Sequence, residues 1–344
     1  MSTFNPKMQL HPFFAKNKRH LDLHKMCFNV NAVSFLEEHR ANIVWEAVSY
    51  NKNAAHLFQA NLGRLNWSTA SLNPAAVRFL LKHPDKIDWF CFSENTSLTT
   101  AILEKYHDKW NWITLSANPS AASYLKRFPH LLNWTMASSN PNLVDYLVSH
   151  HFYKIDWKEF SKNPAAVPTL EKYPENIYWQ YLCKNTNPRA IQLIEQNLHR
   201  ADWFHLSANL NAIPLLERYP DNIEIEHLAT NPNGMPLFEK YLHCVSGDNL
   251  HDIRTGLSMN PSAIPLLVAN PILIDWIWIS QNPAIFVYDY NTMHRTLCLS
   301  KWMCDYTDKI YDPVRLQRYC EKYEYNPLTE KRLYRDIIGN MCVY

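Results

Sequence analysis

Residues 163–177 read NPAAVPTLEKYPENI, and this stretch is the unit from which the chain is built. The chain continues through Tyr178 and Trp179 to a further Asn-Pro pair at Asn187. A period of about 22 residues predicts a solenoid, in which each unit buries its apolar face only against its neighbours. The opening residues are Asn29, Asn51, Asn73, Asn95, Asn118, Asn140, Asn163, Asn187, Asn209, Asn231, Asn260 and Asn282.

A second marker stays in phase with the first. A Trp follows most openers by about sixteen residues, and Ile225 and Arg254 take its place in two units. Because two independent markers keep one register, the repeat is not a chance similarity. The tryptophans are Trp45, Trp67, Trp89, Trp112, Trp134, Trp157, Trp179, Trp203 and Trp276.

Each unit is predicted to hold two short helices. In the unit from Asn260, Pro261 cannot continue a helix, because it lacks an N–H and clashes with the preceding turn. We therefore expect Asn260 to end the previous helix, Ser262 to be the N-cap, and the first helix to begin at Ala263. Pro265 then lies in the first turn, where its missing N–H removes no hydrogen bond.

The second helix begins at the Trp, after an N-cap such as Asp88, Asp156, Asp202 or Asp275. Helices this short are unstable alone in water, so stacking must hold them in a cooperative rod. The predicted fold is all-α, an α-solenoid of helix-turn-helix repeats of about 22 residues with N- and C-terminal capping helices.

Three regions divide the chain. Residues 1–28 are a divergent N-terminal cap, residues 29–290 are the repeat array of about eleven to twelve units, and residues 291–344 are a C-terminal helical cap. Residues 244–252, CVSGDNLHD, are an insertion that we expect to lengthen the loop between the two helices of its unit.

Composition excludes several classes of protein. Only five Gly argue against phosphate-binding loops and dinucleotide folds, and a net charge of +2 is unlike that of an electrostatic nucleic-acid binder. Eight Cys without a CxxC motif are expected to be reduced thiols. The N-terminus lacks a signal-peptide pattern, and no apolar run has membrane-spanning length. We expect a soluble, intracellular protein that does not enter a membrane.

The unit pattern Asn-Pro-x-Ala-Ile-x-x-Leu-Glu followed by Ile-Asp-Trp-x-x-Leu-Ser resembles the repeat proteins of giant DNA viruses of amoebae. The closing NPAIFVYDYNTM (282–293) and the YDPVRLQRY segment (311–319) are also similar to the ends of those proteins. Where that family commonly has His-Pro, this chain has Asp312-Pro313. The resemblance covers about residues 29–320. It implies a viral origin, with a location in the host cytoplasm or the virion, and carries no established activity.

Three patterns invite a chemical interpretation. His20, His24 and Cys27 stand at i, i+4 and i+7, a spacing that could place zinc ligands on one helix face. No fourth ligand is apparent, so we predict a capping helix and neither metal nor cofactor. His150-His151 and the Glu224/Glu226/His227 group suggest a hydrolase, but no second element converges on them and no nucleophile motif is present. We predict no enzyme activity and no catalytic residue.

Aromatic and basic residues could indicate nucleic-acid binding. The Trp recurs at a helix start between apolar residues, which favours packing over base stacking. Basic residues recur near the end of the first helix, but Glu171, Glu217 and Glu239 directly precede three of them and cancel the local charge. A solvated helix end is therefore the preferred interpretation. These basic residues are Lys82, Arg127, Lys172, Arg218 and Lys240.

The positions two residues after the Trp register, such as Tyr181 and Trp278, vary most in character, and the positions just after the Trp include Phe90, Phe204 and Ile277. If the second helices line one face, Phe90, Tyr181, Phe204, Ile277 and Trp278 would expose apolar surface there, which is typical of partner sites. The competing interpretation is that they pack against the next unit. We predict a non-enzymatic protein-protein interaction scaffold with an unknown partner. The alternative is a nucleic-acid-associated helical repeat protein, and the oligomeric state stays open.

Overall fold

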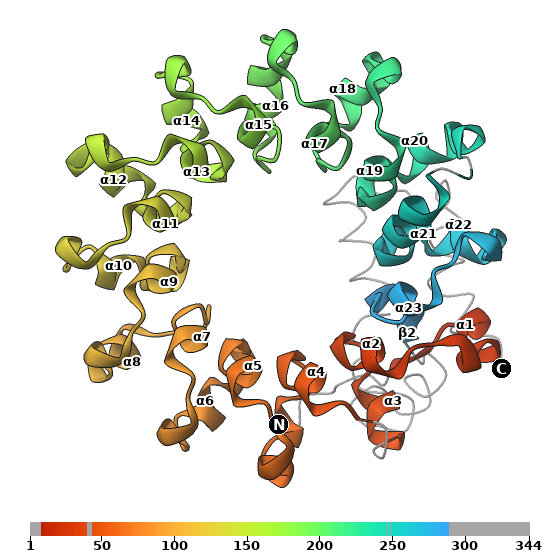
Figure 1. The fold of residues 1–344 in the computed structure, drawn as a ribbon, viewed down its shortest axis with the longest axis horizontal. Coiled ribbons are helices and arrows are strands. Elements are labelled where there is room, and N and C mark those ends of the chain that lie inside the picture. The colour runs from red at the N-terminus through yellow and green to blue at the C-terminus, as the bar shows by residue number, and fades with distance from the viewer. Residues whose placement is uncertain (1–7, 40–42, 246, 248, 289–344) are drawn as a thin grey trace, which may run out of the picture. The chain divides into compact units, whose positions relative to one another are not determined.

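A computed structural model of the protein describes residues 8–39, 43–245, 247 and 249–288. Residues 8–287 form one compact unit in which short helices follow one another around a closed ring (Figure 1). The predicted all-α helical repeat solenoid is confirmed. The predicted C-terminal cap, residues 291–344, lies outside the described residues.

One helix of each unit lies on the inner side of the ring (Figure 1). Most of these inner helices begin at the Trp register, as predicted. They are α2 (Leu23–Phe28), α4 (Trp45–Tyr50), α5 (Trp67–Leu72), α7 (Trp89–Ser93), α9 (Trp112–Ala117), α11 (Trp134–Ser139), α13 (Trp157–Lys162), α15 (Trp179–Leu182), α17 (Trp203–Ser207), α19 (Ile225–Thr230), α21 (Leu250–Met259) and α23 (Trp276–Ile279).

A second set of helices lies on the outer side (Figure 1). These outer helices are α1 (Pro12–Lys16), α3 (Val33–Glu38), α6 (Val77–Leu80), α8 (Thr100–Lys105), α10 (Ala122–Leu125), α12 (Val144–His150), α14 (Val167–Leu170), α16 (Pro188–Glu195), α18 (Ile213–Arg218), α20 (Met235–Lys240) and α22 (Ile264–Ala269). Between α4 and α5 the chain forms the 3-10 helices η3 (Ala55–Leu57) and η4 (Gln59–Arg64) instead.

Single turns of 3-10 helix complete the units. One group opens a unit directly after the buried Asn: η5 (Pro74–Ala76), η8 (Pro119–Ala121), η10 (Pro141–Leu143), η12 (Pro164–Ala166), η16 (Pro232–Gly234), η18 (Pro261–Ala263) and η20 (Pro283–Ile285). The other group precedes the inner helix: η1 (Lys18–His20), η6 (Pro84–Lys86), η7 (His107–Lys109), η9 (Pro129–Leu131), η11 (Phe152–Lys154), η13 (Pro174–Asn176), η14 (Leu198–Arg200), η15 (Pro220–Asn222), η17 (Leu242–Cys244) and η19 (Pro271–Leu273).

The opening Asn joins each unit to the one before it. Asn140 has extended backbone angles, and its Oδ1 accepts a hydrogen bond from the Asn142 N–H at 3.0 Å, so it caps η10. Its Nδ2 donates to the carbonyl oxygens of Ser116 at 3.0 Å and Asn118 at 2.9 Å in the preceding unit. We call the repeated arrangement the asparagine ladder. Its buried members are Asn29, Asn51, Asn73, Asn95, Asn118, Asn140, Asn163, Asn185, Asn209, Asn231, Asn260 and Asn282.

The predicted cap of the first helix is wrong. Asn260, not Ser262, is the capping residue, because its Oδ1 accepts from the Ser262 N–H at 2.9 Å. Its φ of −81° and ψ of 115° are extended, not left-handed. The helix itself starts at Ile264 after the turn η18, so Pro265 does lie in the first helical turn. A cap assigned from local rules alone missed that the Asn amide also serves the neighbouring unit.

One unit also begins two residues earlier than predicted. Asn185 belongs to the asparagine ladder, because its Nδ2 donates to Ser161 O at 2.9 Å and Asn163 O at 3.0 Å. Asn187 instead caps α16 and donates to Pro164 O at 2.8 Å. Asn187 was predicted as the opening residue because Pro188 follows it, whereas Asn185 is followed by Thr186.

The insertion at residues 244–252 does lie between the two halves of its unit, but it is not loop throughout. Residues 250–252 form the first turn of α21, which therefore has ten residues against six in α19. Arg254, at the Trp register, therefore stands in the middle of α21 and not at its start.

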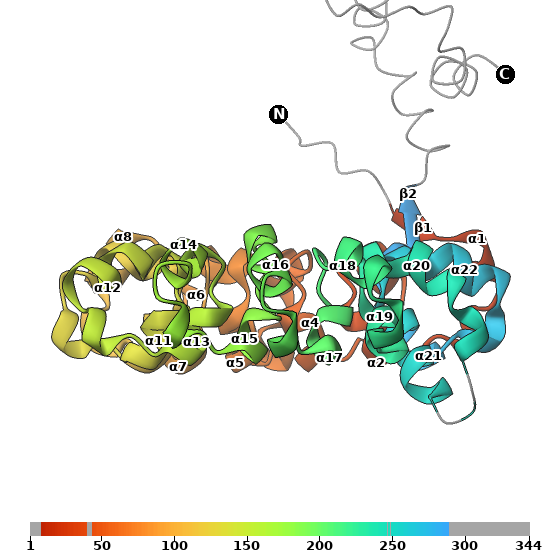
Figure 2. The same ribbon diagram turned by 90° about the horizontal axis from the view of Figure 1, so that it is seen from above.

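The first and last described parts of the array are joined to each other. Strand β1 (Met8–Leu10) pairs with β2 (Phe286–Tyr288), and the two lie side by side in Figure 2. Asn29 donates to Ser280 O at 3.2 Å and Asn282 O at 2.8 Å, so the asparagine ladder continues from the last unit to the first. An open rod with an N-terminal cap was expected, whereas residues 8–28 pack as a link between their two neighbours.

The described helices carry no membrane-spanning segment, since none of them is long and apolar enough to cross a bilayer. The core instead runs continuously around the array. Each unit adds a fully buried residue from its outer helix, such as Leu80 or Leu170, and one from its inner helix, such as Leu115 or Phe160. These layers stack on the next unit, as the period predicts.

Candidate binding surface

The Trp at the start of each inner helix packs on the outer helix of the following unit. The ring of Trp67 lies parallel to that of Phe79, with centroids 5.6 Å apart, and Trp112 lies in the same way on Tyr124 at 6.0 Å. Trp45 is buried, and the other tryptophans of the Trp register are half-buried against the core. Their predicted role in packing is therefore confirmed, and the ring faces of Trp67 and Trp112 that lie on Phe79 and Tyr124 are covered.

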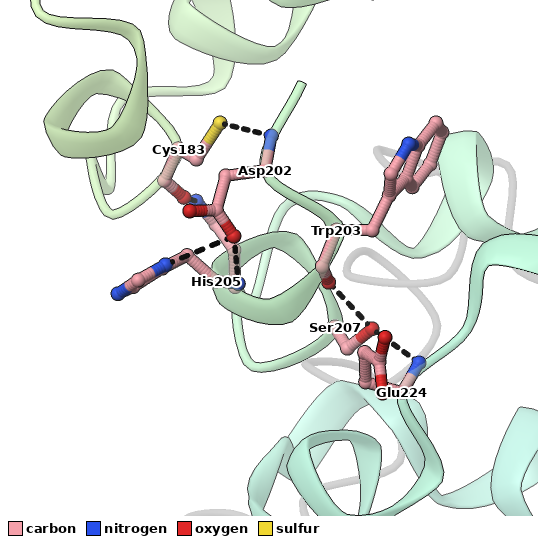
Figure 3. A network of polar contacts seen from close by, with 7 residues as sticks. Cys183, Asp202, Trp203, His205, Ser207 and Glu224 are labelled. Atoms are coloured by element: carbon pink, nitrogen blue, oxygen red, sulfur yellow. Dashed lines mark hydrogen bonds and ion pairs between the residues drawn. The ribbon is translucent and has the colours of Figure 1, made fainter. Parts of the chain in front are cut away.

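A buried hydroxyl near the end of most inner helices forms a second chain of hydrogen bonds. Ser207 Oγ donates to Trp203 O at 2.9 Å and accepts from the Glu224 N–H at 3.0 Å (Figure 3). The bond to Glu224 fixes the residue that precedes the next inner helix, so it sets the position of that helix. We call this arrangement the serine ladder. Its buried members are Ser49, Ser71, Ser93, Ser116, Ser138, Ser161, Ser207, Ser258 and Ser280.

Cys183 replaces the serine in one unit and lies beside Asp202 and His205 (Figure 3). Its Sγ accepts from the Asp202 N–H at 3.4 Å, while Asp202 Oδ1 caps the helix and lies 3.1 Å from His205 Nδ1. Burial raises the pKa of the Cys183 thiol to about 11, so the thiol stays protonated at neutral pH. Although burial alone would raise the pKa of Asp202, hydrogen bonds from His205 lower it. The grouping of Cys, Asp and His is explained by the ladder and the helix cap.

The spacing that suggested zinc does not produce a metal site. Cys27 is fully buried and takes the serine-ladder position, with its Sγ donating to Leu23 O at 3.2 Å. His20 belongs to η1 and lies against Trp276, whereas His24 lies against Phe28 on α2. In the described part of the chain, no three His, Cys, Asp or Glu side chains are grouped to hold a metal ion.

The residues that suggested a hydrolase are likewise spread through structural contacts. His151 Nε2 lies 3.1 Å from the Tyr146 hydroxyl, and His150 stacks on the ring of the same Tyr146. The backbone of Glu224 belongs to the serine ladder, and His227 lies against Phe204 with ring centroids 3.6 Å apart.

Basic residues on the outer helices are paired between neighbouring units. Arg127 contacts Glu104 at 2.6 Å, and Lys240 lies 4.0 Å from Glu217. Arg218 pairs with Glu195, whose pKa is held below its ordinary value by the hydrogen bond from that guanidinium. Exposed pairs of this kind contribute little stability, but they neutralise much of the basic stripe that the sequence suggested.

The five predicted partner-binding residues all lie on inner helices, with different exposure. Phe90, Phe204 and Ile277 each follow a Trp and are 55%, 50% and 52% exposed. Tyr181 is half-buried, with the Lys158 and Lys184 ammonium groups 5.0 Å and 5.4 Å from its ring. Trp278 is half-buried beneath the Lys25 ammonium at 3.9 Å. A role in partner binding stays a prediction for all five.

Several exposed apolar residues of the inner helices were not predicted. Ile113 directly follows Trp112 and is 52% exposed, as Phe90 is after Trp89. Its position in the repeat was the signal that could have identified it. The others are Met136, which lies two residues after Trp134 as Tyr181 does after Trp179, and Tyr50 and Met259, which each directly precede a ladder Asn.

Comparisons of the chain with protein-family models, with curated proteins and with solved structures find no match. The surface must therefore be interpreted from its own chemistry. That chemistry is apolar contact area presented by rigid helices, with charged side chains of both signs between the apolar ones.

Proposed function

We propose that the protein is a non-enzymatic scaffold that binds another protein through the exposed side chains of its inner helices. The observation that carries the proposal is the repetition of exposed apolar residues after the Trp register, at Phe90, Ile113, Phe204 and Ile277. Large apolar side chains that stay in water on a well-packed protein are typical of interaction surfaces.

The inner helices suit this role because they are held rigidly. Most are fixed at their start by a capping carboxylate or amide, such as Asp88 or Asn111, and at their end by the two ladders. A rigid surface loses little conformational entropy when a partner binds, which favours affinity. The position after the Trp is also free to vary, because the fold does not bury it.

The viral origin of the chain, and its location in the host cytoplasm or the virion, are also proposals. They rest on the resemblance of the Asn-Pro and Ile-Asp-Trp repeats to those of giant amoebal viruses. An antibody raised against the protein would test both. We expect it to detect the chain in infected amoebae, in the cytoplasm or in purified particles, and its absence from infected cells would contradict the proposal.

The binding proposal is tested with two matched substitutions in one unit. Ile277 on α23 and Ile272 in the turn η19 are 52% and 77% exposed, so neither Ile277→Lys nor Ile272→Lys should disturb the core. We expect affinity capture from infected cells with quantitative mass spectrometry to show a partner that is retained by Ile272→Lys and lost by Ile277→Lys. Phe90→Lys should show the same loss.

Circular dichroism must confirm equal helix content in every variant. Equal retention of the partner by both lysine variants would show that the inner helices are not the binding surface. Direct titration with fluorescent single-stranded RNA and DNA at low salt distinguishes the other class of ligand. Strong, salt-sensitive binding there would replace the scaffold proposal with a nucleic-acid function.

A further inference from the structure

Residues near the two ends of the described array, 282–285 and 11–14, together have the sequence pattern of one repeat. The regular unit at residues 260–267 reads NPSAIPLL, while residues 282–285 read NPAI and residues 11–14 read HPFF. Placed in series they give NPAI-HPFF, with both prolines and three of the four apolar positions in register; His11 stands where the regular unit has Ile264. Pro12 lies in the first turn of α1 as Pro265 does in α22. We call residues 282–285 together with residues 11–28 the composite unit.

The contacts of the composite unit repeat those of a regular one. Phe13 lies parallel to Trp276 with ring planes 12° apart, as Phe79 does to Trp67 at 14°. The Asp22 N–H donates to Ser280 Oγ at 2.8 Å, so the serine ladder also crosses the junction.

The composite unit differs from the others at one bond. In a regular unit the opening turn leads into the outer helix through the chain, as η12 leads into α14 at Val167. At the same place in the composite unit, Ile285 and His11 are not joined by a peptide bond. Instead, the His11 N–H donates to Ile285 O at 2.8 Å. A hydrogen bond and the β1–β2 pair therefore stand where a peptide bond stands elsewhere.

We propose that the composite unit is a clasp, at which the closed ring opens and recloses reversibly. The described junctions within the array are crossed by the covalent chain, so separating them requires a unit to unfold. Opening between residues 276–286 and residues 8–35 separates one interface and leaves the described helices formed. In a linear array of weakly stable units, the boundary that lacks covalent continuity is the one that opens first.

Hydrogen exchange tests the clasp in the unmodified protein, because the equivalent amide bonds to a serine hydroxyl at most junctions. Asp22 donates to Ser280 Oγ, and Asp88 and Asp156 donate in the same way to Ser71 and Ser138. We expect the amides of Asp22 and His11 to exchange about tenfold or more faster than those of Asp88 and Asp156, since local opening exposes only the first pair.

A pair of substitutions tests the same idea by shape. Asn29→Ala removes the donors to Ser280 and Asn282 across the clasp, and Asn140→Ala removes the equivalent donors at a regular junction. We expect small-angle X-ray scattering to show an increased radius of gyration for Asn29→Ala alone, with helix content unchanged.

A milder pair covers the case in which a buried Asn variant does not fold. Asn31→Ala removes a single bond to Pro283 O, and Asn142→Ala removes its counterpart to Pro119 O, both of 3.0 Å. We expect only Asn31→Ala to speed exchange at Asp22. Equal exchange at Asp22 and Asp88 in the unmodified protein, or equal effects of the two members of each pair, would overturn the clasp. None of these measurements involves a partner, so the proposed function is tested separately.

Discussion

Replacing one amide of the asparagine ladder should destabilise the whole array, and Asn140→Ala is the substitution that isolates the effect. The Asn140 side chain is fully buried between two units. It donates to Ser116 O and Asn118 O and accepts from the Asn142 N–H. Alanine can adopt the extended backbone angles of this position, and it removes all three hydrogen bonds.

The expected loss follows from what each partner can do afterwards. Asn118 O keeps a second donor, the Ala121 N–H at 3.1 Å, and the Asn142 N–H lies beside an exposed side chain that water can reach. Ser116 O, in the buried junction, loses its amide donor. A buried polar group left without its partner costs about 1–3 kcal/mol, and the two better-solvated bonds add less. We expect the free energy of unfolding to fall by about 2–4 kcal/mol.

Urea denaturation followed by both tryptophan fluorescence and circular dichroism measures this change, provided that the two transitions coincide. Asn142→Ala is the control, because it removes one exposed hydrogen bond to Pro119 O and should cost less than about 1 kcal/mol. If Asn140→Ala is no less stable than Asn142→Ala, the asparagine ladder does not hold the units together as argued.

Three further predictions concern single positions of the repeat. Burial raises the pKa of Cys183 to about 11, so the thiol stabilises the fold below its unfolded pKa and this contribution is lost as pH rises from about 9 to 11. In thermal melts, Cys183→Ser should lose less stability over that range. Ala229→Ser should bring no gain, because the Ile253 N–H already bonds to Asn249 O within α21 at 3.1 Å and needs no hydroxyl. Pro168→Ala, in the first turn of α14, should cost less than about 1 kcal/mol in urea denaturation.

The Trp period was sufficient to predict where most inner helices start. Helices α5, α7, α9 and α13 begin at their Trp, and Asp88 and Asp156 cap two of them as expected. These features follow from the sequence because a helix N-terminus is decided by residues within one turn of it. Local chemistry was therefore enough to predict the repeat and half of each unit.

The asparagine ladder could not be predicted in the same way, because its partners belong to another unit. An Asn side chain has an acceptor and two donors. Local rules place only the acceptor, on the N–H two residues later, and say nothing of carbonyls about 22 to 24 residues earlier in the chain. This is why Ser262 was preferred over Asn260 as a cap and Asn187 over Asn185 as an opener.

The candidate surface was predicted in part for a similar reason. Exposure of Phe90, Phe204 and Ile277 follows from their place on the helix. Tyr181 and Trp278 are partly covered by Lys158 and Lys25, which belong to neighbouring units. The sequence of a single unit does not reveal how closely its neighbours approach.

Closure of the ring could not be predicted from the sequence of any single unit, because it depends on the rotation between all units. Twelve ladder positions in the described residues require about 30° of rotation per unit, 360° divided by twelve, and a small error in each unit would leave the ends apart. The closing sequence nevertheless carried a signal, because HPFF at residues 11–14 continues the register of NPAI at residues 282–285.

Closure also resolves a difficulty that every open solenoid has. In a linear array the first ladder amide and the last ladder carbonyls would lack partners, and a separate cap would have to cover them. Here the Asn29 amide donates to the carbonyl oxygens of Ser280 and Asn282, and Ser280 Oγ accepts from the Asp22 N–H. The N-terminal segment thus satisfies the last unit by acting as the next repeat. That explains why residues 11–28 keep a Pro, an Asp cap and a ladder Cys although their sequence otherwise diverges.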